Sequence, residues 1–331
     1  MSDDKDRITR RQFIAAAAAS GAALAAIRLL SRSRAPLRVR SHAPSRLRKG
    51  ISIVHGHAQD PENEPEAIRR LTRAAVEHLG GMDALVTPGS RVVIKPNMAW
   101  AREPRFGAST NPWVVAALVE MCREARAGAV LVMDNTISRN PEPSYRLSGI
   151  AEAARAAGAR VPHVNRTRAR ELPVPDGFAL SRWPFCEEFV SPRHCDVLIN
   201  VPVLKDHGTS RLTIGLKNAF GMVDGERGKL HPQIHSKIPD LHRVVKVDLT
   251  IMDAWRVMRR HGPTGGRLQD VDNSPAGARR IVAGTDPVAV DAYGAHMFDL
   301  GPQDVGFVAR AQEAGLGTAD WRSVLIREES L

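Results

Sequence analysis

The segment Asp196–His207 reads Asp-Val-Leu-Ile-Asn-Val-Pro-Val-Leu-Lys-Asp-His and is the most informative part of the chain. Its first half, Asp196–Val201, is a short apolar run of the kind that forms a buried β-strand. Polar residues follow, from Asn200 through Lys205 and His207. Ligands of parallel sheets bind beyond the carboxyl ends of the strands, so this segment predicts both a strand and the edge of a binding site.

Similar apolar runs recur along the chain and alternate with longer segments of helical periodicity. This alternation predicts an α/β fold with a largely parallel or mixed sheet flanked by helices, Rossmann-like and divided into two lobes of about 50–180 and 181–331. The lobe boundary is expected in the irregular, proline-containing segment 165–190. The other predicted strands are 51–54, 91–95, 129–133, 160–163, 249–252, 280–283 and 324–326, and the predicted helices are 66–79, 112–127, 149–157, 212–220, 241–245, 286–298 and 304–314.

The composition is that of an ordinary globular protein. The chain has 331 residues, of which 43% are hydrophobic and 25% charged, and these values exclude collagen-like, disordered and multi-span membrane proteins. The net charge is +11, but residues 26–49 contribute +8 of it and residues 50–331 only +2. No nucleic-acid partner is therefore expected. Cys122, Cys186 and Cys195 are too few for a disulfide scaffold, and free thiols are favoured over a Cys186–Cys195 disulfide.

The N-terminal segment resembles a bacterial twin-arginine export signal. Thr9-Arg10-Arg11-Gln12-Phe13-Ile14 precedes an alanine-rich apolar run that ends near Ile27. We predict that residues 1–27 are a cleaved signal or an uncleaved anchor and that the export machinery is a partner. The protein would then be periplasmic or lie on the outer face of the cytoplasmic membrane. Proteins exported in the folded state often carry a cofactor, but the sequence identifies none.

Residues 28–49 contain eight basic residues and no acidic one, with serine, proline and little apolar periodicity. We predict a flexible basic linker between the signal and an α/β domain at 50–331. Two interpretations of this linker remain open: contact with anionic lipid headgroups, or a solvated spacer.

Lysine is rare in this chain, and its positions indicate a binding site. The sequence has eight lysines and 39 arginines, so arginine is the usual surface cation. A lysine in an apolar or strand-end context suggests that a compact ammonium group is needed, for example to bind a phosphate or carboxylate. The predicted ligand-binding residues are Lys95, Asn97, Asn200, Lys217, Asn218, Arg227, Asp253, Asp286 and Asp291, and the predicted catalytic residues are Lys205, His207 and His231.

Each residue type has an expected role at this site. The lysines would neutralise a small anionic ligand, Arg227 would clamp it and the asparagines would orient it. His207 or His231 would transfer a proton, because the pKa of histidine is ordinarily near neutral. The three aspartates would hold a lysine or a metal. The spacing of His231 and His235 fits one helical face, but hydrogen-bonded histidines are favoured over a metal site, and the metal stays unknown.

The order of these motifs resembles the domain-of-unknown-function family 362 over roughly residues 50–328. The resemblance implies an α/β fold, and some members of that family are joined to ferredoxin-type iron–sulfur modules. This chain has no CxxCxxC run, so an iron–sulfur role is not carried over. The matching segments are 93–97, 110–112, 196–207, 212–221, 227–231, 249–254, 262–266 and 284–292.

Three functions fit these observations. The favoured one is an exported protein that binds a small anionic ligand or cofactor in a cleft lined by lysine, histidine and asparagine. A role as an enzyme associated with redox chemistry is left open. The alternative is a non-catalytic, extracytoplasmic small-molecule-binding protein. A third is a membrane-tethered docking protein whose working surface is residues 28–49.

Overall fold

The computed structural model describes residues 37–57 and 63–331, and Val39–Leu331 form one compact unit. The predicted signal at 1–27 and the first part of the predicted linker lie outside the described residues. The strands are β1 (Ile51–His55), β2 (Arg91–Pro96), β3 (Ala129–Val132), β4 (Arg170–Pro173), β5 (Arg182–Phe185), β6 (Val197–Val201), β7 (Val203–His207), β8 (Arg211–Thr213), β9 (Leu249–Met258), β10 (Val271–Asp272), β11 (Arg280–Gly284) and β12 (Leu325–Ser330). The helices are α2 (Glu64–Glu77), α3 (Pro112–Glu124), α4 (Glu142–Leu147), α5 (Ile150–Ala156), α6 (Glu187–Val190), α7 (Ile234–His242), α8 (Pro287–His296) and α9 (Gly306–Glu313), with 3₁₀ turns that include η4 (Leu216–Met222) and η5 (Arg227–Leu230).

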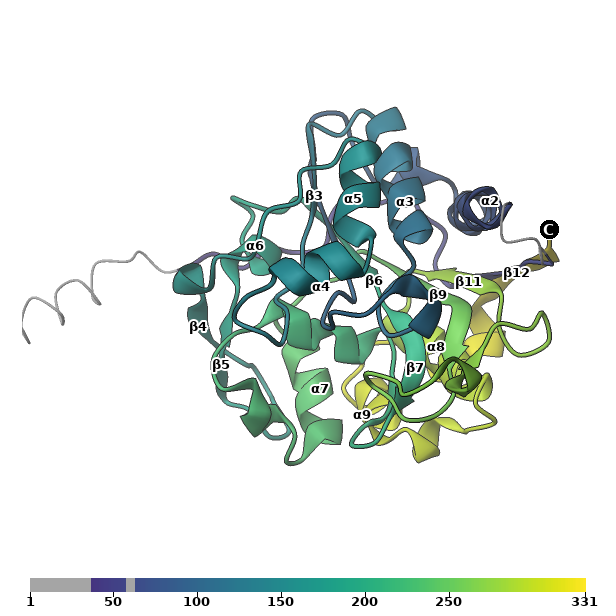
Figure 1. The fold of residues 1–331 in the computed structure, drawn as a ribbon. Coiled ribbons are helices and arrows are strands. Elements are labelled where there is room, and N and C mark those ends of the chain that lie inside the picture. The colour runs from purple at the N-terminus through teal and green to yellow at the C-terminus, as the bar shows by residue number, and fades with distance from the viewer. Residues whose placement is uncertain (1–36, 58–62) are drawn as a thin grey trace, which may run out of the picture. The chain divides into compact units, whose positions relative to one another are not determined.

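One mixed sheet runs through the unit in the order β12-β1-β11-β9-β6-β2-β3 (Figure 1). Strands β9, β6, β2 and β3 are parallel, whereas β11 is antiparallel to both of its neighbours. The predicted α/β class with a largely parallel or mixed sheet is therefore confirmed. Strand β1 lies between β11 and β12, so residues of both predicted lobes, 50–180 and 181–331, contribute strands to this sheet.

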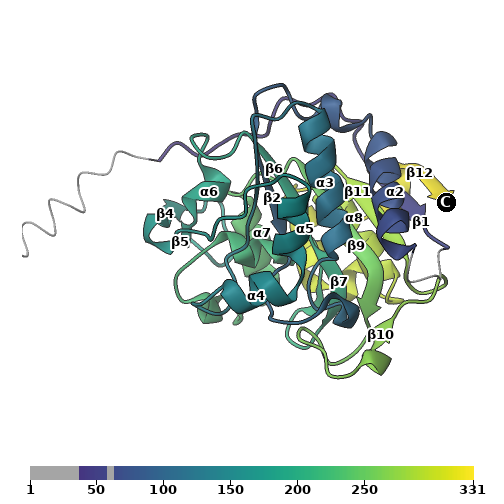
Figure 2. The ribbon, with the colours of Figure 1, turned by 45° about the horizontal axis from the view of Figure 1, so that its top comes forward.

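Helices cover both faces of the sheet. Helices α2, α3 and α5 pack on one face and α7, α8 and α9 on the other (Figure 2). Each layer buries its own apolar cluster, with Leu118 of α3 in the same cluster as Ile199, and Val290 of α8 in the same cluster as Val282. Strand β6 is buried along its whole length because helices cover it from both sides.

Two helices begin where the sequence predicts because their first residues cap them. The Asn111 side chain accepts the backbone N–H of Trp113 at 3.0 Å at the start of α3. The Asp286 carboxylate accepts the N–H groups of Val288 and Ala289, each at 2.9 Å, at the start of α8. In both cases proline follows the cap, where a helix needs no N–H donor.

Lys205 and His207 follow the predicted strand 196–201, and they lie in a further strand that the sequence analysis did not predict. After Pro202 the chain enters a further strand, β7, which is parallel to β9 and antiparallel to β8. The backbone hydrogen bonds of the sheet therefore fix both residues, and Lys205 lies opposite Thr213.

The prediction of a helix at 212–220 is wrong. Its first residues form β8, and the following ones form the 3₁₀ turn η4. The N–H groups of Gly215 and Leu216 donate to the Asp291 carboxylate at 2.7 and 2.8 Å. A buried side chain from α8 therefore accepts hydrogen bonds at the start of η4 and sets the direction of the turn.

Two further segments are more regular than expected. The segment 165–190, predicted to be irregular, contains the hairpin β4–β5 and the short helix α6. Helix α7 begins at Ile234 and continues past Pro239, so the helix predicted at 241–245 starts earlier and ends at His242. In 37–57 and 63–331, no helix is both long and apolar enough to cross a membrane.

Residues 39–49, expected as the end of a flexible linker, are fixed to the folded unit. Arg40 is only 4% exposed, and its guanidinium pairs with the buried Asp248 carboxylate. The backbone N–H of Ala43 donates to the same carboxylate at 2.7 Å, and Leu47 lies in the apolar core. A buried ion pair and a buried apolar side chain therefore fix this part of the segment.

Candidate functional site

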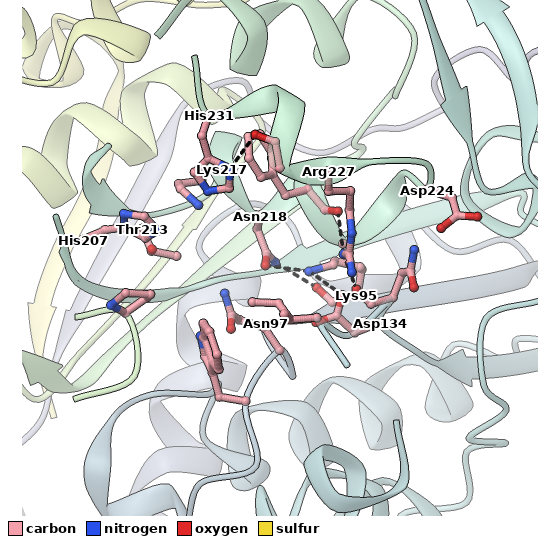
Figure 3. Close-up of a pocket in the computed structure, with 18 of the residues that line it drawn as sticks. Lys95, Asn97, Asp134, His207, Thr213, Lys217, Asn218, Asp224, Arg227 and His231 are labelled. Atoms are coloured by element: carbon pink, nitrogen blue, oxygen red, sulfur yellow. Dashed lines mark hydrogen bonds and ion pairs between the residues drawn. The ribbon is translucent and has the colours of Figure 1, made fainter. Parts of the chain in front are cut away.

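A cavity of about 1110 Å³ lies beyond the carboxyl ends of β2 and β3 and against β7, β8, η4 and η5 (Figure 3). This volume suits a small organic molecule better than a single inorganic ion, since ligand pockets commonly measure roughly 300–1,000 Å³. The predicted site residues that line it are Lys95, Asn97, Lys205, His207, Lys217, Asn218, Arg227 and His231.

Lys95, at the end of β2, is already paired. Its Nζ lies 3.0 Å from Oδ1 of Asp134 and donates to Oδ1 of Asn218 at 2.6 Å. Asp134 accepts in turn the backbone N–H of Met98 at 2.7 Å. Burial lowers the pKa of Lys95, and the Asp134 charge opposes that shift. Lys95 therefore organises the cavity wall and is not an unneutralised cation.

Gly221 allows this pair to form. A Cβ atom at this position would lie 1.9 Å from Oδ1 of Asp134 and 2.6 Å from Cε of Lys95. Real Cβ atoms do not approach other atoms that closely, so any larger residue would displace the pair.

Asn200 lies behind the cavity instead of lining it. Its Oδ1 accepts from Nδ2 of Asn218 at 2.8 Å, and its Nδ2 donates to the carbonyl of Gly215 at 2.9 Å. The predicted role of Asn200 as a ligand contact is therefore replaced by a role in orienting Asn218. Asn97 does line the cavity, and its Oδ1 is buried without a hydrogen-bond partner in the described part of the chain.

Lys205 and Lys217 differ from Lys95 because no carboxylate in the described ranges lies within ion-pairing distance of either ammonium. Lys205 is 1% exposed and donates to the carbonyl of Ala108. Lys217 is 8% exposed, and its Nζ lies 4.6 Å from the ring centroid of Phe220. Burial, followed by the charges of Lys217 and Lys95, lowers the pKa of Lys205 far below its usual value. Burial and the Lys95 charge lower the pKa of Lys217 to about 8.

The two nitrogens of the His207 ring differ in their hydrogen bonding. Its Nδ1 accepts the backbone N–H groups of Thr209 at 3.2 Å and Ser210 at 3.4 Å. The neutral ring therefore carries its proton on Nε2. Burial and the charges of the nearby lysines lower the pKa of His207 to about 3, so the ring stays neutral near pH 7.

In His231 the other ring nitrogen, Nδ1, carries the proton. Its Nδ1 lies 3.3 Å from the carbonyl oxygen of Gly228, which can only accept, so the neutral ring carries its proton on Nδ1. Nε2 is then the acceptor. The ring meets Phe220 edge-on at 5.9 Å between centroids, so His231 and Lys217 approach the same aromatic side chain. His231 is therefore the better candidate for accepting a proton.

Arg227 and Arg166 form a second cationic region of the cavity wall. Nη1 of Arg227 donates to the carbonyl of Asn135 at 2.6 Å, and Nη2 of Arg166 donates to the carbonyl of Thr136 at 2.8 Å. Arg227 also donates to that Thr136 carbonyl. Neutral oxygens hold both guanidinium groups, so their positive charges remain available to an anion.

The charge of the whole lining is positive. Six lysine or arginine side chains face three acidic ones, and Glu226 is an exposed rim residue already paired with Lys229 at 3.0 Å. Such an excess of cations in a cavity wall attracts and concentrates anions. The cationic lining residues are Lys95, Arg139, Arg166, Lys205, Lys217 and Arg227, and the acidic ones are Asp134, Asp224 and Glu226.

The carboxylates of the three predicted aspartates accept hydrogen bonds from backbone N–H groups. Asp253 accepts from the N–H groups of Asn111 and Trp255, Asp286 caps α8, and Asp291 caps η4. Burial raises the pKa of Asp253 to about 6 and that of Asp291 to about 8. Their role is to position elements around the cavity, since none of the three lines it.

Several lining residues were outside the predicted set. Asp134 and Asn135 directly follow a predicted strand, so their position alone could have identified them. Arg166 and Trp100 lie in segments without periodicity, and nothing in the sequence marks them. The described residues contain no group of three or more His, Cys, Asp or Glu side chains placed to hold a metal, and the three cysteines are buried free thiols.

The residues that line this cavity lie within the part of the chain that matches a known protein family. The model of the family described as Domain of unknown function (DUF362) matches residues 92–296, which include every predicted site residue. The chain is 26% identical to a thylakoid-associated protein of Synechocystis sp. over 276 residues, covering 81% of this chain and 80% of that protein. No solved structure matches the chain significantly. Because the family model spans more than half of the sequence, the chain belongs to the DUF362 family.

Proposed function

We propose that this protein binds a small organic anion in the cavity between η4, η5 and the ends of β2 and β3. The observation that carries the proposal is the environment of Lys217, a buried amine in the cavity wall with no carboxylate partner in the described part of the chain. An unpaired buried charge is costly, and an anionic ligand would supply the missing partner. Arg227 and Arg166, held by neutral oxygens, would bind the same ligand from the other side of the cavity.

Calorimetric titration with lactate and citrate tests this proposal, because these organic anions are fully ionised at pH 8. The wild-type protein should bind at least one of them, and Lys217→Met should weaken that binding at least tenfold, which is about 1.4 kcal/mol. Lys229→Met is the matched control, since Lys229 is an exposed lysine of the neighbouring turn and should leave the affinity unchanged. Binding that is equally strong in Lys217→Met would reject the cavity as the site.

We also propose that the protein is exported by the twin-arginine route and acts in the periplasm or at the outer face of the cytoplasmic membrane. The support is the Arg10-Arg11 pair ahead of an apolar run, together with the basic residues that follow it. The thylakoid association of the Synechocystis relative is compatible with a membrane-surface location. Cell fractionation tests the export route by comparing the wild type with the variant in which both arginines are changed to lysine. Only the variant is expected to stay in the cytoplasm. Equal distributions of the two proteins would contradict export by this route.

Two kinds of protein fit anion binding in this cavity: an enzyme, and a non-catalytic extracytoplasmic binding protein. The enzyme is favoured because a donor histidine and an acceptor histidine, His207 and His231, line the same cavity as Lys217. A binding protein has no need of two histidines in complementary tautomers. Recovery of the bound ligand unchanged after long incubation would favour the alternative.

A further inference from the structure

Lys217 has the environment of a reactive amine. Its Nζ contacts the face of Phe220 at 4.6 Å from the ring centroid, and no hydrogen-bond acceptor in the described ranges contacts it. Lys95 and Lys205, two other basic groups, line the same cavity. A buried ammonium beside other cations gives up its proton more easily, and the neutral amine is the nucleophilic form.

We propose that Lys217 forms an imine with the carbonyl group of a small oxo acid bound in this cavity. The inference rests on the proposed anion binding, because the carboxylate of the oxo acid is the anion that the cavity attracts. It names the substrate class and gives Lys217 a covalent role.

Two histidines could supply the proton transfers that imine formation requires. The Nζ of the neutral amine adds to the carbonyl carbon, and the carbonyl oxygen finally leaves as water with the two amine protons, so no oxidant or reductant takes part. Nε2–H of His207 can donate a hydrogen bond to the carbonyl oxygen. Nε2 of His231 is the acceptor that the same cavity offers for a proton from the amine, and both His231 and Lys217 contact the Phe220 ring.

The cavity also contains the charges that would orient an oxo acid. Arg227 and Arg166 hold positive charges on neutral oxygens, and guanidinium groups pair well with carboxylates. Asn97 presents a buried Oδ1 that has no partner in the described part of the chain, so its amide group is also free to contact a ligand. Such an imine withdraws electrons from the neighbouring carbon, so a proton can be removed there and carbon–carbon bond chemistry becomes possible at that carbon.

Reductive trapping tests the inference on the full chain. The protein is incubated with pyruvate and sodium cyanoborohydride, and the modified peptide is located by mass spectrometry. One adduct is expected at Lys217, with a mass gain equal to pyruvic acid less one oxygen atom. In Lys217→Arg the amount of adduct should fall at least tenfold. In Lys229→Arg, the exposed control, it should stay the same.

Lactate separates this inference from the proposed function, because it has the carboxylate of pyruvate but no carbonyl group. Lys217→Arg keeps a positive charge and should still bind lactate in the calorimeter. If lactate binds the wild type but no adduct forms at Lys217, or the adduct forms on Lys205 or on exposed lysines, the imine is overturned and anion binding stands. If pyruvate, lactate and citrate all fail to bind and no adduct forms, both are overturned.

Discussion

At the scale of single residues, the cavity depends on a few close contacts between charged groups. Gly221 leaves the space for one of these contacts, because a Cβ atom there would collide with the Lys95–Asp134 pair. Gly221→Ala should cost about 1–3 kcal/mol of unfolding free energy, as overpacking does elsewhere, and weaken anion binding. Denaturant unfolding checks this against Gly228→Ala, a cavity-lining glycine with open space around its Cβ position, which should behave like the wild type. Equal stability of the two variants would contradict the role given to Gly221.

The buried His207 ring predicts how the stability of the fold depends on pH. Its pKa is about 3 in the folded protein and close to the ordinary value of 6.5 in the unfolded chain. Between these values the unfolded state binds more protons, so His207 makes stability fall as the pH is lowered from 6.5 toward 3. His207→Asn should therefore lose less unfolding free energy than the wild type between pH 7 and pH 5. The exposed His57→Asn should follow the wild-type curve, and a parallel curve for His207→Asn would contradict the neutral, buried state of the ring.

At the scale of elements, η4 is the segment that positions the site, and α8 holds it through Asp291. Asp291→Ala would leave two buried N–H groups unpaired, at about 1–3 kcal/mol each, and move Lys217 and Asn218. We expect both stability and anion affinity to fall. Asp286→Ala removes the cap of the same helix and should cost about 1 kcal/mol of stability with unchanged affinity. Denaturant unfolding and calorimetry on both variants check this difference, and a loss of affinity in Asp286→Ala would contradict it.

The elements that could be predicted from sequence are those with strong local signals. Strands β1, β2, β3, β6 and β11 are apolar runs, and α3 and α8 begin with a capping side chain and proline. The turn η4 could not be predicted, because its direction depends on Asp291, 75 residues away from Leu216. For the same reason Asp291 was expected to hold a lysine or metal: the sequence shows a carboxylate in an apolar helix but not which N–H groups it meets.

The cavity itself was only partly predictable. Lysine scarcity and strand-end position pointed to Lys95, Lys205 and Lys217, and all three line the cavity. Sequence alone could not separate the paired Lys95 from the unpaired Lys217, since their difference depends on Asp134 in three dimensions. Arg166 was missed because an arginine in an irregular segment has no distinguishing signal in a chain with 39 arginines.

At the scale of the whole molecule, the segment 39–49 is part of the folded unit and not only a spacer. Arg40→Met would leave the Asp248 carboxylate buried without its cation, and breaking a buried ion pair in this way costs about 3–5 kcal/mol. The exposed Arg38→Met should change stability little. Chemical denaturation of both variants checks this. Equal stabilities would mean that the segment is the flexible linker its composition suggests.

The central claim is that buried, unpaired lysines of the cavity acquire their partner from an organic anion. Because Lys217 has a pKa of about 8 without a ligand, a bound anion should raise that pKa, and binding at pH 8 should take up protons from the buffer. The most direct measurement is calorimetric titration at pH 8 with lactate or citrate, whichever binds more tightly, in two buffers of different ionisation enthalpy. The account predicts net proton uptake in the wild type and a much smaller uptake in Lys217→Met. Binding without proton uptake, or uptake that is the same in both proteins, would contradict it.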